Sequence, residues 1–250
     1  FEKGEMIPDE TIKTDISNQY DYAKWNESIV DLEDLKTNNE RDEINENLIS
    51  RMRAFGYTTE TMQFMLLPLV SELRDPLGSM GNDAALACLS DKPRLLFDYF
   101  KQLFAQVTNP AIDSIREEVI MSLECLIGPE GNLLENNKDN VKRLRIKNTI
   151  LSNKDLDSIK EIAQGDWKTK TIDLTFLKND SLKGMLARLE EVCQEAEEAI
   201  EDKYTFIVLS DKEVSSSKIS LSALLACSSI HHHLIEKQLR TKIGIILETG

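Results

Sequence analysis

Two short, continuously apolar segments near the end of the chain constrain its fold most strongly. Tyr204–Leu209 and Lys242–Leu247 have the pattern of buried strands, and the intervening Ser220–Leu239 has that of a helix buried on most sides. A strand, a helix and a strand within about 45 residues form a βαβ unit, which favours parallel pairing and a right-handed crossover. The sequence therefore predicts an α/β fold with an open, mainly parallel sheet built from βαβ units.

The residues before this unit continue the same architecture. Leu182–Glu201 is predicted to be a long amphipathic helix, and Thr169–Phe176 alternates as a strand with one buried face does. Ser152–Ile162 begins with a serine N-cap followed by Asp155, which predicts a helix. The side chains expected to face inward from the long helix are Met185, Leu186, Leu189, Val192, Cys193, Ala196 and Ile200.

The amino-terminal half is predicted to be rich in helices. Short helices capped by the aspartates Asp9 and Asp21 are expected at residues 9–17 and 22–28. Ile44–Phe55 has helical spacing and ends at Gly56. Residues 36–47, which overlap the first turn of this helix, are strongly charged and suggest a linker. We therefore place a domain boundary near residue 40.

Three further segments carry apolar patterns. A helix opening at Thr58 is expected to bury one face, although Pro68 should kink or end it. Pro93–Phe104 predicts a helix with a broad aromatic face, and Glu118–Ile127 fits either a helix or a buried strand. The face expected to be buried after Thr58 consists of Met62, Met65, Leu66, Leu69 and Val70.

Composition excludes several classes of function. The net charge is −14 and the pI about 4.8, so nucleic acid and anionic membrane surfaces are not expected as partners. No segment predicts a signal peptide or a membrane span. The four cysteines lack CxxC spacing, which favours reduced thiols. We therefore expect an intracellular protein, either cytoplasmic or in a plastid or mitochondrion.

Candidate chemistry is sparse. Adjacent helix residues point about 100° apart, so His231, His232 and His233 cannot all reach one metal; a structural role is favoured over a single histidine ligand with a distant carboxylate. The Gly78–Asp83 loop fits a tight turn better than an anion cradle. Ser210–Asp211 follows a predicted strand, where α/β sheets bind ligands, although a helix cap or turn explains it equally well.

Several short motifs are more specific than these candidate sites. The sharpest are Ala54–Tyr57, Leu77–Asp83, Asp91–Arg94, Asp98–Pro110, Ile115–Glu117 and Gly128–Gly131. Others are Leu209–Asp211, Leu224–Ala226, His231–Leu234 and Arg240–Lys242. Together these motifs resemble those of the glutamate synthase family. By this resemblance, residues 1–40 are the tail of a glutamine amidotransferase domain with its linker. Residues 41–250 are the family's central domain, truncated at its carboxyl end, so we expect a piece of a longer polypeptide.

The resemblance implies an overall reaction for the parent enzyme. Glutamine is hydrolysed, ammonia passes through a tunnel and adds to 2-oxoglutarate, and FMN reduces the imine with electrons relayed by an iron–sulfur cluster. NADH or ferredoxin is the electron donor, and the residues near Ser122–Gly128 look more like the NADH-dependent branch. The resemblance places no catalytic residue, cofactor site or metal ligand in this chain. Its partners would be the flanking amidotransferase and synthase domains.

The resemblance also suggests which residues line the tunnel or a domain interface. The candidates are Gly78, Ser79, Met80, Gly81, Asn82, Asp83, Gln106, Thr108 and Asn109, most of which are small or are neutral and polar. Ala84, Ala85, Ala111 and Ser114 depart from the family pattern and put the rigidity of these loops in question. Two alternatives stay open: a free-standing interaction or regulatory module, and a small metal-dependent enzyme using His231 or His233.

Overall fold

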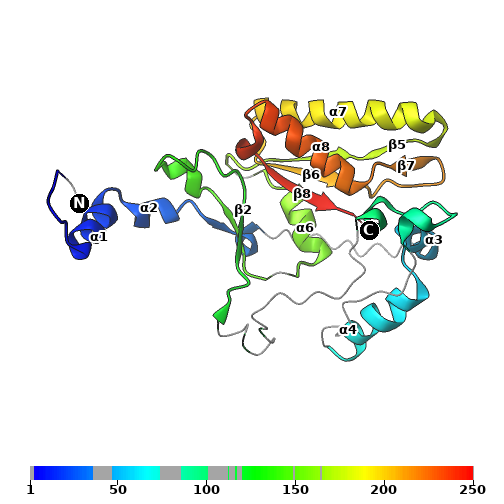
Figure 1. Ribbon diagram of the computed structural model, residues 1–250, viewed down its shortest axis with the longest axis horizontal. Helices are drawn as coiled ribbons and strands as arrows, with labels where there is room; N and C mark the ends of the chain where they lie inside the picture. The colour runs from blue at the N-terminus through cyan, green and yellow to red at the C-terminus, as the bar shows by residue number, and fades with distance from the viewer. Residues whose placement is uncertain are drawn as a thin grey trace.

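The computed structural model describes residues 3–35, 47–73, 86–100, 112, 116, 120–148, 150–163 and 165–249. These residues form a mixed α/β fold with a parallel sheet of three strands at its centre, in the order β4–β6–β8 (Figure 1). The strands are β4 (Thr169–Asp173), β6 (Phe206–Ser210) and β8 (Gly244–Glu248). The α/β fold with an open parallel sheet is thus confirmed.

Two βαβ units build this sheet. Helix α7 (Ser181–Glu201) connects β4 to β6, and α8 (Ala223–Glu236) connects β6 to β8. Both crossovers step in the same direction across the sheet, and right-handed connections then place both helices on one face. Figure 1 shows α7 and α8 together on that face. Their inner sides enclose the larger core with Ile172, Leu174, Val192, Ala196, Ala199, Ile207, Leu209, Leu221, Ala223, Ala226, Ile230, Leu234 and Ile243.

The other face of the sheet packs on a second, smaller core. Helix α6 (Asn153–Lys160) and a mixed sheet in the order β1–β3–β2 supply it. The strands are β1 (Val30–Asp31), β2 (Cys125–Ile127) and β3 (Leu144–Ile146), with β3 parallel to β1 and antiparallel to β2. The core side chains are Leu32, Leu144, Ile146, Ile159, Ile162, Trp167 and Phe206.

The position of β6 between two cores explains why its sequence is continuously apolar. Successive side chains of a strand point to opposite faces, so Ile207 enters the core under α7 and α8 while Phe206 enters the other core. The Phe206 ring stacks on Trp167 with 5.7 Å between ring centroids. All five residues of β6 are buried, as expected for a strand covered on both faces.

The strand predicted at Thr169–Phe176 is divided into two. The Asp173 carboxylate accepts hydrogen bonds from the Thr175 backbone N–H and hydroxyl, both at 2.9 Å. This turn redirects the chain into β5 (Thr175–Leu177), which pairs with β7 (Lys218–Ser220) in an antiparallel ribbon. The sequence did not indicate β7, because three residues are too short to show a period.

Helix α8 corrects a second expectation. It begins at Ala223 and ends at Glu236, within the predicted Ser220–Leu239. It is buried along one face and not on most sides, since Leu224 and Ile235 are exposed. In α7, Leu186 is likewise exposed although it was predicted to face inward. The buried face of α8 consists of Ala223, Ala226, Ile230 and Leu234.

The amino-terminal helices form largely as predicted. They are α1 (Asp9–Asn18), α2 (Tyr22–Asn26), α3 (Leu48–Ala54) and α4 (Leu67–Ser71). Asp21 caps α2 by accepting a hydrogen bond from the Lys24 backbone N–H. The N-cap of α1 is Pro8, and Asp9 lies in the first turn instead. In α6 the predicted Ser152 cap forms a capping box with Asp155.

The apolar face of the helix predicted after Thr58 was expected to be buried, and this prediction is wrong. A kink or helix end was expected at Pro68. The structure instead changes there from a π-helix at Thr61–Leu66 to the α-helix α4, with Pro68 in its first turn. Met65 and Val70 are exposed, Val70 at 73%. The helical period is present, but within the described residues no core cluster covers it.

The helix predicted at Pro93–Phe104 is also wrong within its described part. Only Leu96–Tyr99 is helical, as a 3-10 turn; residues 101–104 lie outside the described part. Leu95 is extended, with φ −61° and ψ 146°, so a helix cannot continue back to Pro93, and Phe100 is exposed. For Glu118–Ile127, the described residues include a helical Ile120 and strand β2 at Cys125–Ile127. Cys125 and Leu126 are exposed, so the segment is neither one helix nor a buried strand.

None of the described helices combines the length and apolarity needed to cross a membrane.

Candidate functional site

Polar side chains collect at the carboxyl edge of the parallel sheet. Asp173, Ser210 and Glu248 end β4, β6 and β8, and the strand register makes them neighbours in one row. Asp211 and Thr249 follow directly. Ligands of open α/β sheets bind at this edge, which is where the sequence placed its Ser210–Asp211 candidate.

The centre of this row is a closed ion-pair network. The Ser210 hydroxyl donates to the Glu248 carboxylate, and Lys160 Nζ donates to both Glu248 oxygens at 3.0 and 3.2 Å. Burial acts to raise the pKa of Glu248, but the hydrogen bonds from Ser210 and Lys160 outweigh it, so this pKa lies below its ordinary value. The network ties α6 to β8, and its charges compensate each other.

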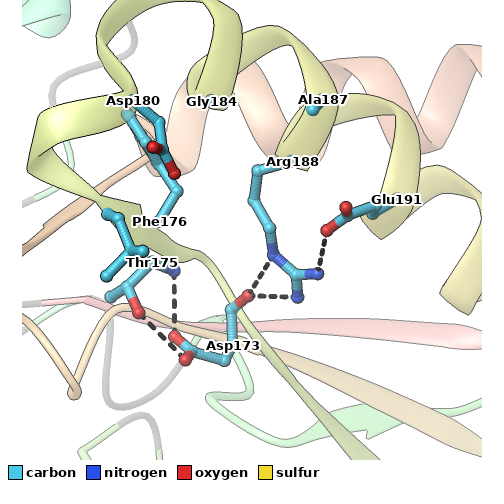
Figure 2. A pocket seen from close by; sticks show the side chains of 9 residues that line it. Asp173, Thr175, Phe176, Asp180, Gly184, Ala187, Arg188 and Glu191 are labelled. Atoms are coloured by element: carbon cyan, nitrogen blue, oxygen red, sulfur yellow. Dashed lines mark hydrogen bonds and ion pairs between the residues drawn. The ribbon is translucent and has the colours of Figure 1, made fainter.

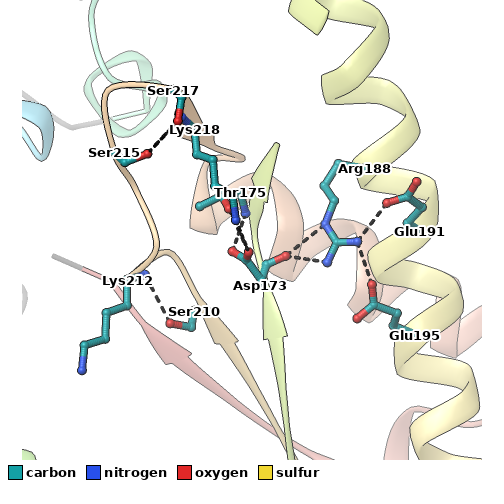
Figure 3. A network of polar contacts seen from close by, with 10 residues as sticks. All are labelled: Asp173, Thr175, Arg188, Glu191, Glu195, Ser210, Lys212, Ser215, Ser217 and Lys218. Atoms are coloured by element: carbon teal, nitrogen blue, oxygen red, sulfur yellow. Dashed lines mark hydrogen bonds and ion pairs between the residues drawn. The ribbon is translucent and has the colours of Figure 1, made fainter. Parts of the chain in front are cut away.

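A second network fastens the end of β4 to α7. Figure 3 shows Arg188 donating to the Asp173 carbonyl, with Nε at 3.0 Å, and to Glu191 and Glu195 at 2.9 and 2.7 Å. Burial acts to lower the pKa of Arg188, but its two carboxylate partners raise it overall. Lys218 lies 3.7 Å from the Asp173 carboxylate. We interpret this network as a structural joint.

A shallow pocket of about 380 Å³ opens beside this joint. Figure 2 shows Asp180 and Phe176 on one side and Arg188 with Glu191 on the other. A side chain at Gly184 would fill part of it, since an added Cβ would lie 2.4 Å from the Asp180 Cβ. The guanidinium of Arg188 is already engaged by a carbonyl and two carboxylates, so it serves the fold.

A larger pocket of about 500 Å³ lies at the same edge, between the end of β6 and the start of α8. Its polar lining comes from Arg94, Asp211, Ser222 and Thr249. Asp211 is only 4% exposed, and its carboxylate accepts a hydrogen bond from the Thr249 hydroxyl at 2.6 Å. Its walls are mostly apolar, and they include Phe55, Leu95, Leu96, Phe97, Val214 and Ile219.

Gly56 shapes one wall of this larger pocket. It lies two residues after α3 with a φ of +79°, a conformation that glycine adopts without strain. A Cβ at this position would lie 2.5 Å from a methyl carbon of Leu95. The turn therefore brings Phe55 and Leu95 together, and the helix stop predicted at Gly56 is also a close packing contact.

His231 and His233 have separate hydrogen-bond partners, and the ring of His232 lies edge-on to that of His231. His231 Nδ1 accepts a hydrogen bond from Arg240 Nε at 3.0 Å, and His233 Nε2 lies 2.9 Å from a Glu197 oxygen. The hydrogen bond with His233 lowers the pKa of Glu197. His232 is exposed. Within the described residues no group of three histidine, cysteine or acidic side chains could hold a metal.

The predicted tunnel or interface residues Gly78, Ser79, Met80, Gly81, Asn82, Asp83, Gln106, Thr108 and Asn109 all lie outside the described residues. They therefore stay a prediction from the family resemblance.

Sequence reasoning missed the residues that organise both pockets. Arg188 lies three residues after Met185 and four before Val192, on the helix face that was predicted to point inward. Ser222 precedes an apolar helix and has the residue type of an N-cap. Arg94 belongs to the motif Asp91–Arg94, but no local pattern indicates that it lines a pocket, because its place depends on the distant turn at Gly56.

Comparison with known proteins identifies relatives for the whole chain. Residues 50–250 match the family model described as the glutamate synthase central domain. Glutamate synthase [NADPH] large chain from Bacillus subtilis is 43% identical over 100% of this chain and 16% of its own length. Glutamate synthase [NADH] from Schizosaccharomyces pombe is 40% identical over 99% of this chain and 12% of its own length.

A ferredoxin-dependent relative is more distant. The chloroplastic ferredoxin-dependent glutamate synthase from Spinacia oleracea is 33% identical over 99% of this chain and 15% of its own length. The chain thus spans about one eighth to one sixth of the curated relatives it matches.

Proposed function

Because the chain belongs to the glutamate synthase family and comprises its central domain, we propose that it holds two reaction centres of a larger enzyme in register. The match over residues 50–250, together with relatives six to eight times longer, carries this proposal. The parent enzyme makes L-glutamate from L-glutamine and 2-oxoglutarate. Residues 1–40 end its amidotransferase domain, and residues 41–250 begin the connection to its synthase domain.

The architecture suits a rigid connector. Strand β6 is buried on both faces, so the helices α7 and α8 and the α6 layer are held on one sheet. The edge network of Lys160, Ser210 and Glu248 fastens the layers further. Close-packed cores transmit displacement rather than absorb it, and that property keeps distant sites at a fixed separation.

We further propose that the loops at residues 78–83 and 106–109 line the ammonia path. Neutral hydroxyl and amide side chains such as Ser79 and Asn109 would pass ammonia without stabilising ammonium, whereas a buried carboxylate would favour the charged form. The FMN and iron–sulfur chemistry belongs to other parts of the parent polypeptide. Cys193 and Cys227 both border the larger core, and burial raises the pKa of the Cys193 thiol, which disfavours the thiolate that a cluster ligand needs.

A reduced pyridine nucleotide is the proposed electron donor. The NADPH- and NADH-named relatives are 40–43% identical, whereas the spinach ferredoxin-named relative is 33% identical. Activity of the intact polypeptide with NADH or NADPH, compared with reduced ferredoxin, tests this assignment.

The ammonia path is tested in the intact polypeptide by substituting its proposed lining. Ser79→Val and Asn109→Leu should raise the free ammonia released per 2-oxoglutarate consumed, while glutamine hydrolysis continues. Thr14→Val, on the exposed surface of α1, is the matched control and should leave this ratio unchanged. Equal ratios in all variants would show that these loops do not border the path.

A further inference from the structure

We propose that His231 is an acid-sensitive latch, which holds the 3-10 turn η7 (Arg240–Lys242) and, through this turn, the loop at residues 128–134. Three motifs that the connector role leaves unexplained meet at this place: Gly128–Gly131, His231–Leu234 and Arg240–Lys242. The latch is built from contacts within this chain, so it does not depend on the connector role.

The latch itself is a pair of hydrogen bonds from Arg240. Its Nε donates to His231 Nδ1 at 3.0 Å, and its Nη1 donates to the Ile243 carbonyl at 3.0 Å. Ile243 directly precedes β8 and is buried in the larger core. A guanidinium is always protonated and can only donate. His231 Nδ1 is therefore the acceptor, so this imidazole is neutral and carries its proton on Nε2.

The turn η7 holds the loop that follows β2. The Thr241 carbonyl accepts a hydrogen bond from the Gly131 backbone N–H at 2.9 Å. Farther along the loop, Leu133 and Leu134 are 74% and 96% exposed, so apolar packing contributes little to fixing them. The position of this loop therefore depends on the turn, and the position of the turn depends on the Arg240 contacts.

Protonation of His231 breaks the latch. Histidine ordinarily changes its charge between about pH 8 and pH 5. The second proton of the His231 ring goes to Nδ1, which is the nitrogen that accepts from Arg240. Two donors and two positive charges then face each other, and the hydrogen bond is lost. The contact is thus present at neutral and alkaline pH and is lost in acid, which releases η7 and its hold on Gly131.

His233, on the same helix, responds in the opposite direction. Its Nε2 lies 2.9 Å from a Glu197 oxygen, and this hydrogen bond lowers the pKa of Glu197. An ionised carboxylate only accepts, so Nε2 donates and a second proton on Nδ1 leaves the contact intact. A charged imidazolium strengthens the bond. Acid therefore tightens the side of α8 that faces α7 and loosens the side that faces η7.

The charged and titratable groups around these two histidines, among the described residues, come from η7, α7 and α8 itself. Arg240 lies on η7 and Glu197 on α7, while Lys237 on α8 is 3.7 Å from Glu197. The His232 ring is 5.2 Å from the His231 ring. The strands beneath α8 and the residue before β8 contribute the apolar side chains Ile207, Leu209, Ile243 and Ile245. The contact with Arg240 therefore determines the response of His231.

Hydrogen–deuterium exchange of the intact polypeptide at about pH 8 and about pH 5.5, corrected for intrinsic exchange rates, tests the latch. Protection of the peptides covering residues 128–134 and 239–243 should fall about tenfold in acid, as expected for one lost hydrogen bond. Residues 206–210 of β6 should keep their protection, which separates release of the latch from general unfolding. Unchanged protection of residues 128–134, or an equal loss in β6, would overturn the proposal.

Variants assign the response to His231. His231→Gln keeps an acceptor for Arg240 but does not titrate, so residues 128–134 should be equally protected at both pH values. His233→Gln keeps a donor for Glu197 and is the matched control, which should show the same tenfold loss as the unaltered protein. Acid loss that persists in His231→Gln, or disappears in His233→Gln, would contradict the proposal.

A third variant gives an independent measurement. Arg240→Ala removes the contact at every pH, so residues 128–134 should be weakly protected at both values. The unfolding temperature of each variant at about pH 8 verifies that it is folded. Strong protection of this loop in a folded Arg240→Ala protein would show that the turn does not hold it, and the latch would be refuted.

Discussion

Two regions of the molecule, residues 165–249 around the sheet and the helices of residues 47–73, both contain apolar residues at helical spacing. These residues are buried in the first region and exposed in the second. In the first region, Val192 and Ile230 are wholly buried between helices and sheet. In the second, Met65 and Leu69 are four residues apart, as on one face of a helix, and are 53% and 40% exposed. Helical periodicity in a sequence therefore indicates which face of a helix is apolar. Whether that face is buried depends on a neighbouring element that packs against it.

This difference has a physical origin in the connectivity. A βαβ unit brings its own covering layer, because the crossover helix must return over the sheet. A short helix pair such as α3 and α4 supplies only its own apolar stripe. Within the described residues, the segment 47–73 therefore leaves apolar side chains exposed, whereas residues 165–249 form a core.

The largest difference in stability between the two regions is expected when a buried and an exposed phenylalanine are each replaced by alanine. Phe206→Ala removes a ring that is 0% exposed and stacked on Trp167, so we expect a loss of about 3–5 kcal/mol in the free energy of unfolding. Phe64→Ala should cost less than about 0.5 kcal/mol, as exposed positions do. Urea unfolding of the two variants measures the difference, and similar losses would refute the contrast.

A methyl group added inside the sheet should have the next largest effect. A Cβ at Gly244 would lie 2.8 Å from a ring carbon of Phe206, which cannot move freely in its core. Gly244→Ala should therefore cost about 1–3 kcal/mol through overpacking. Gly4→Ala is a comparison at a glycine with open space around it, although its φ of +89° adds some backbone strain. Thermal unfolding should show a clearly larger loss for the Gly244 variant.

The ion pair at the sheet edge should contribute a smaller amount. Lys160 and Glu248 are mostly buried and 3.0 Å apart, so Lys160→Met, which leaves the carboxylate without its cation, should cost about 1–2 kcal/mol. Denaturant unfolding at neutral pH checks this value. An unchanged stability would mean that the carboxylate finds another partner.

The same pair predicts a dependence on pH. The folded-state pKa of Glu248 is lowered, with burial opposing and the bonds from Ser210 and Lys160 prevailing. Its contribution is thus fully present above the unfolded pKa and is lost as the pH falls through the folded pKa. Between pH 7 and 3, Lys160→Met should lose less stability than the unaltered chain. A parallel decline in the two proteins would contradict the assigned cause.

The smallest effect is expected on the amino-terminal surface. Lys13 and Asp9 form an ion pair at 2.6 Å on α1, with both side chains more than 70% exposed. Lys13→Ala should change the free energy of unfolding by less than about 0.5 kcal/mol, because water and salt screen such pairs. Unfolding at low and high salt measures this, and a loss above 1 kcal/mol would show that α1 is packed more tightly than its exposure indicates.

The sequence predicted the elements whose signals are local. The apolar run of β6 and the capping box of Ser152 and Asp155 were recognised because each pattern lies within a few residues. The end of β4 at Asp173 was not predicted. Asp173 accepts a hydrogen bond from the Thr175 backbone N–H, but in the sequence it cannot be distinguished from a polar residue within a strand. The short strands β1, β3 and β7 gave no period to detect.

The pockets could be predicted only in part. Ser210 and Asp211 were placed at the correct sheet edge from topology, because strand ends follow directly from the βαβ order. Arg94 and Phe55 reach the same pocket through a turn at Gly56 and the packing of Leu95. Such contacts join residues far apart in the chain, and no local pattern specifies them.

The connector role is tested most directly by the coupling between the two reactions in the intact polypeptide. Glutamine hydrolysed per 2-oxoglutarate consumed should rise in Phe206→Ala, because loosening the core between the two faces of the sheet disturbs the separation of the sites. The ratio should stay unchanged in Phe64→Ala. An unchanged ratio in Phe206→Ala, with that variant destabilised as expected, would contradict the account.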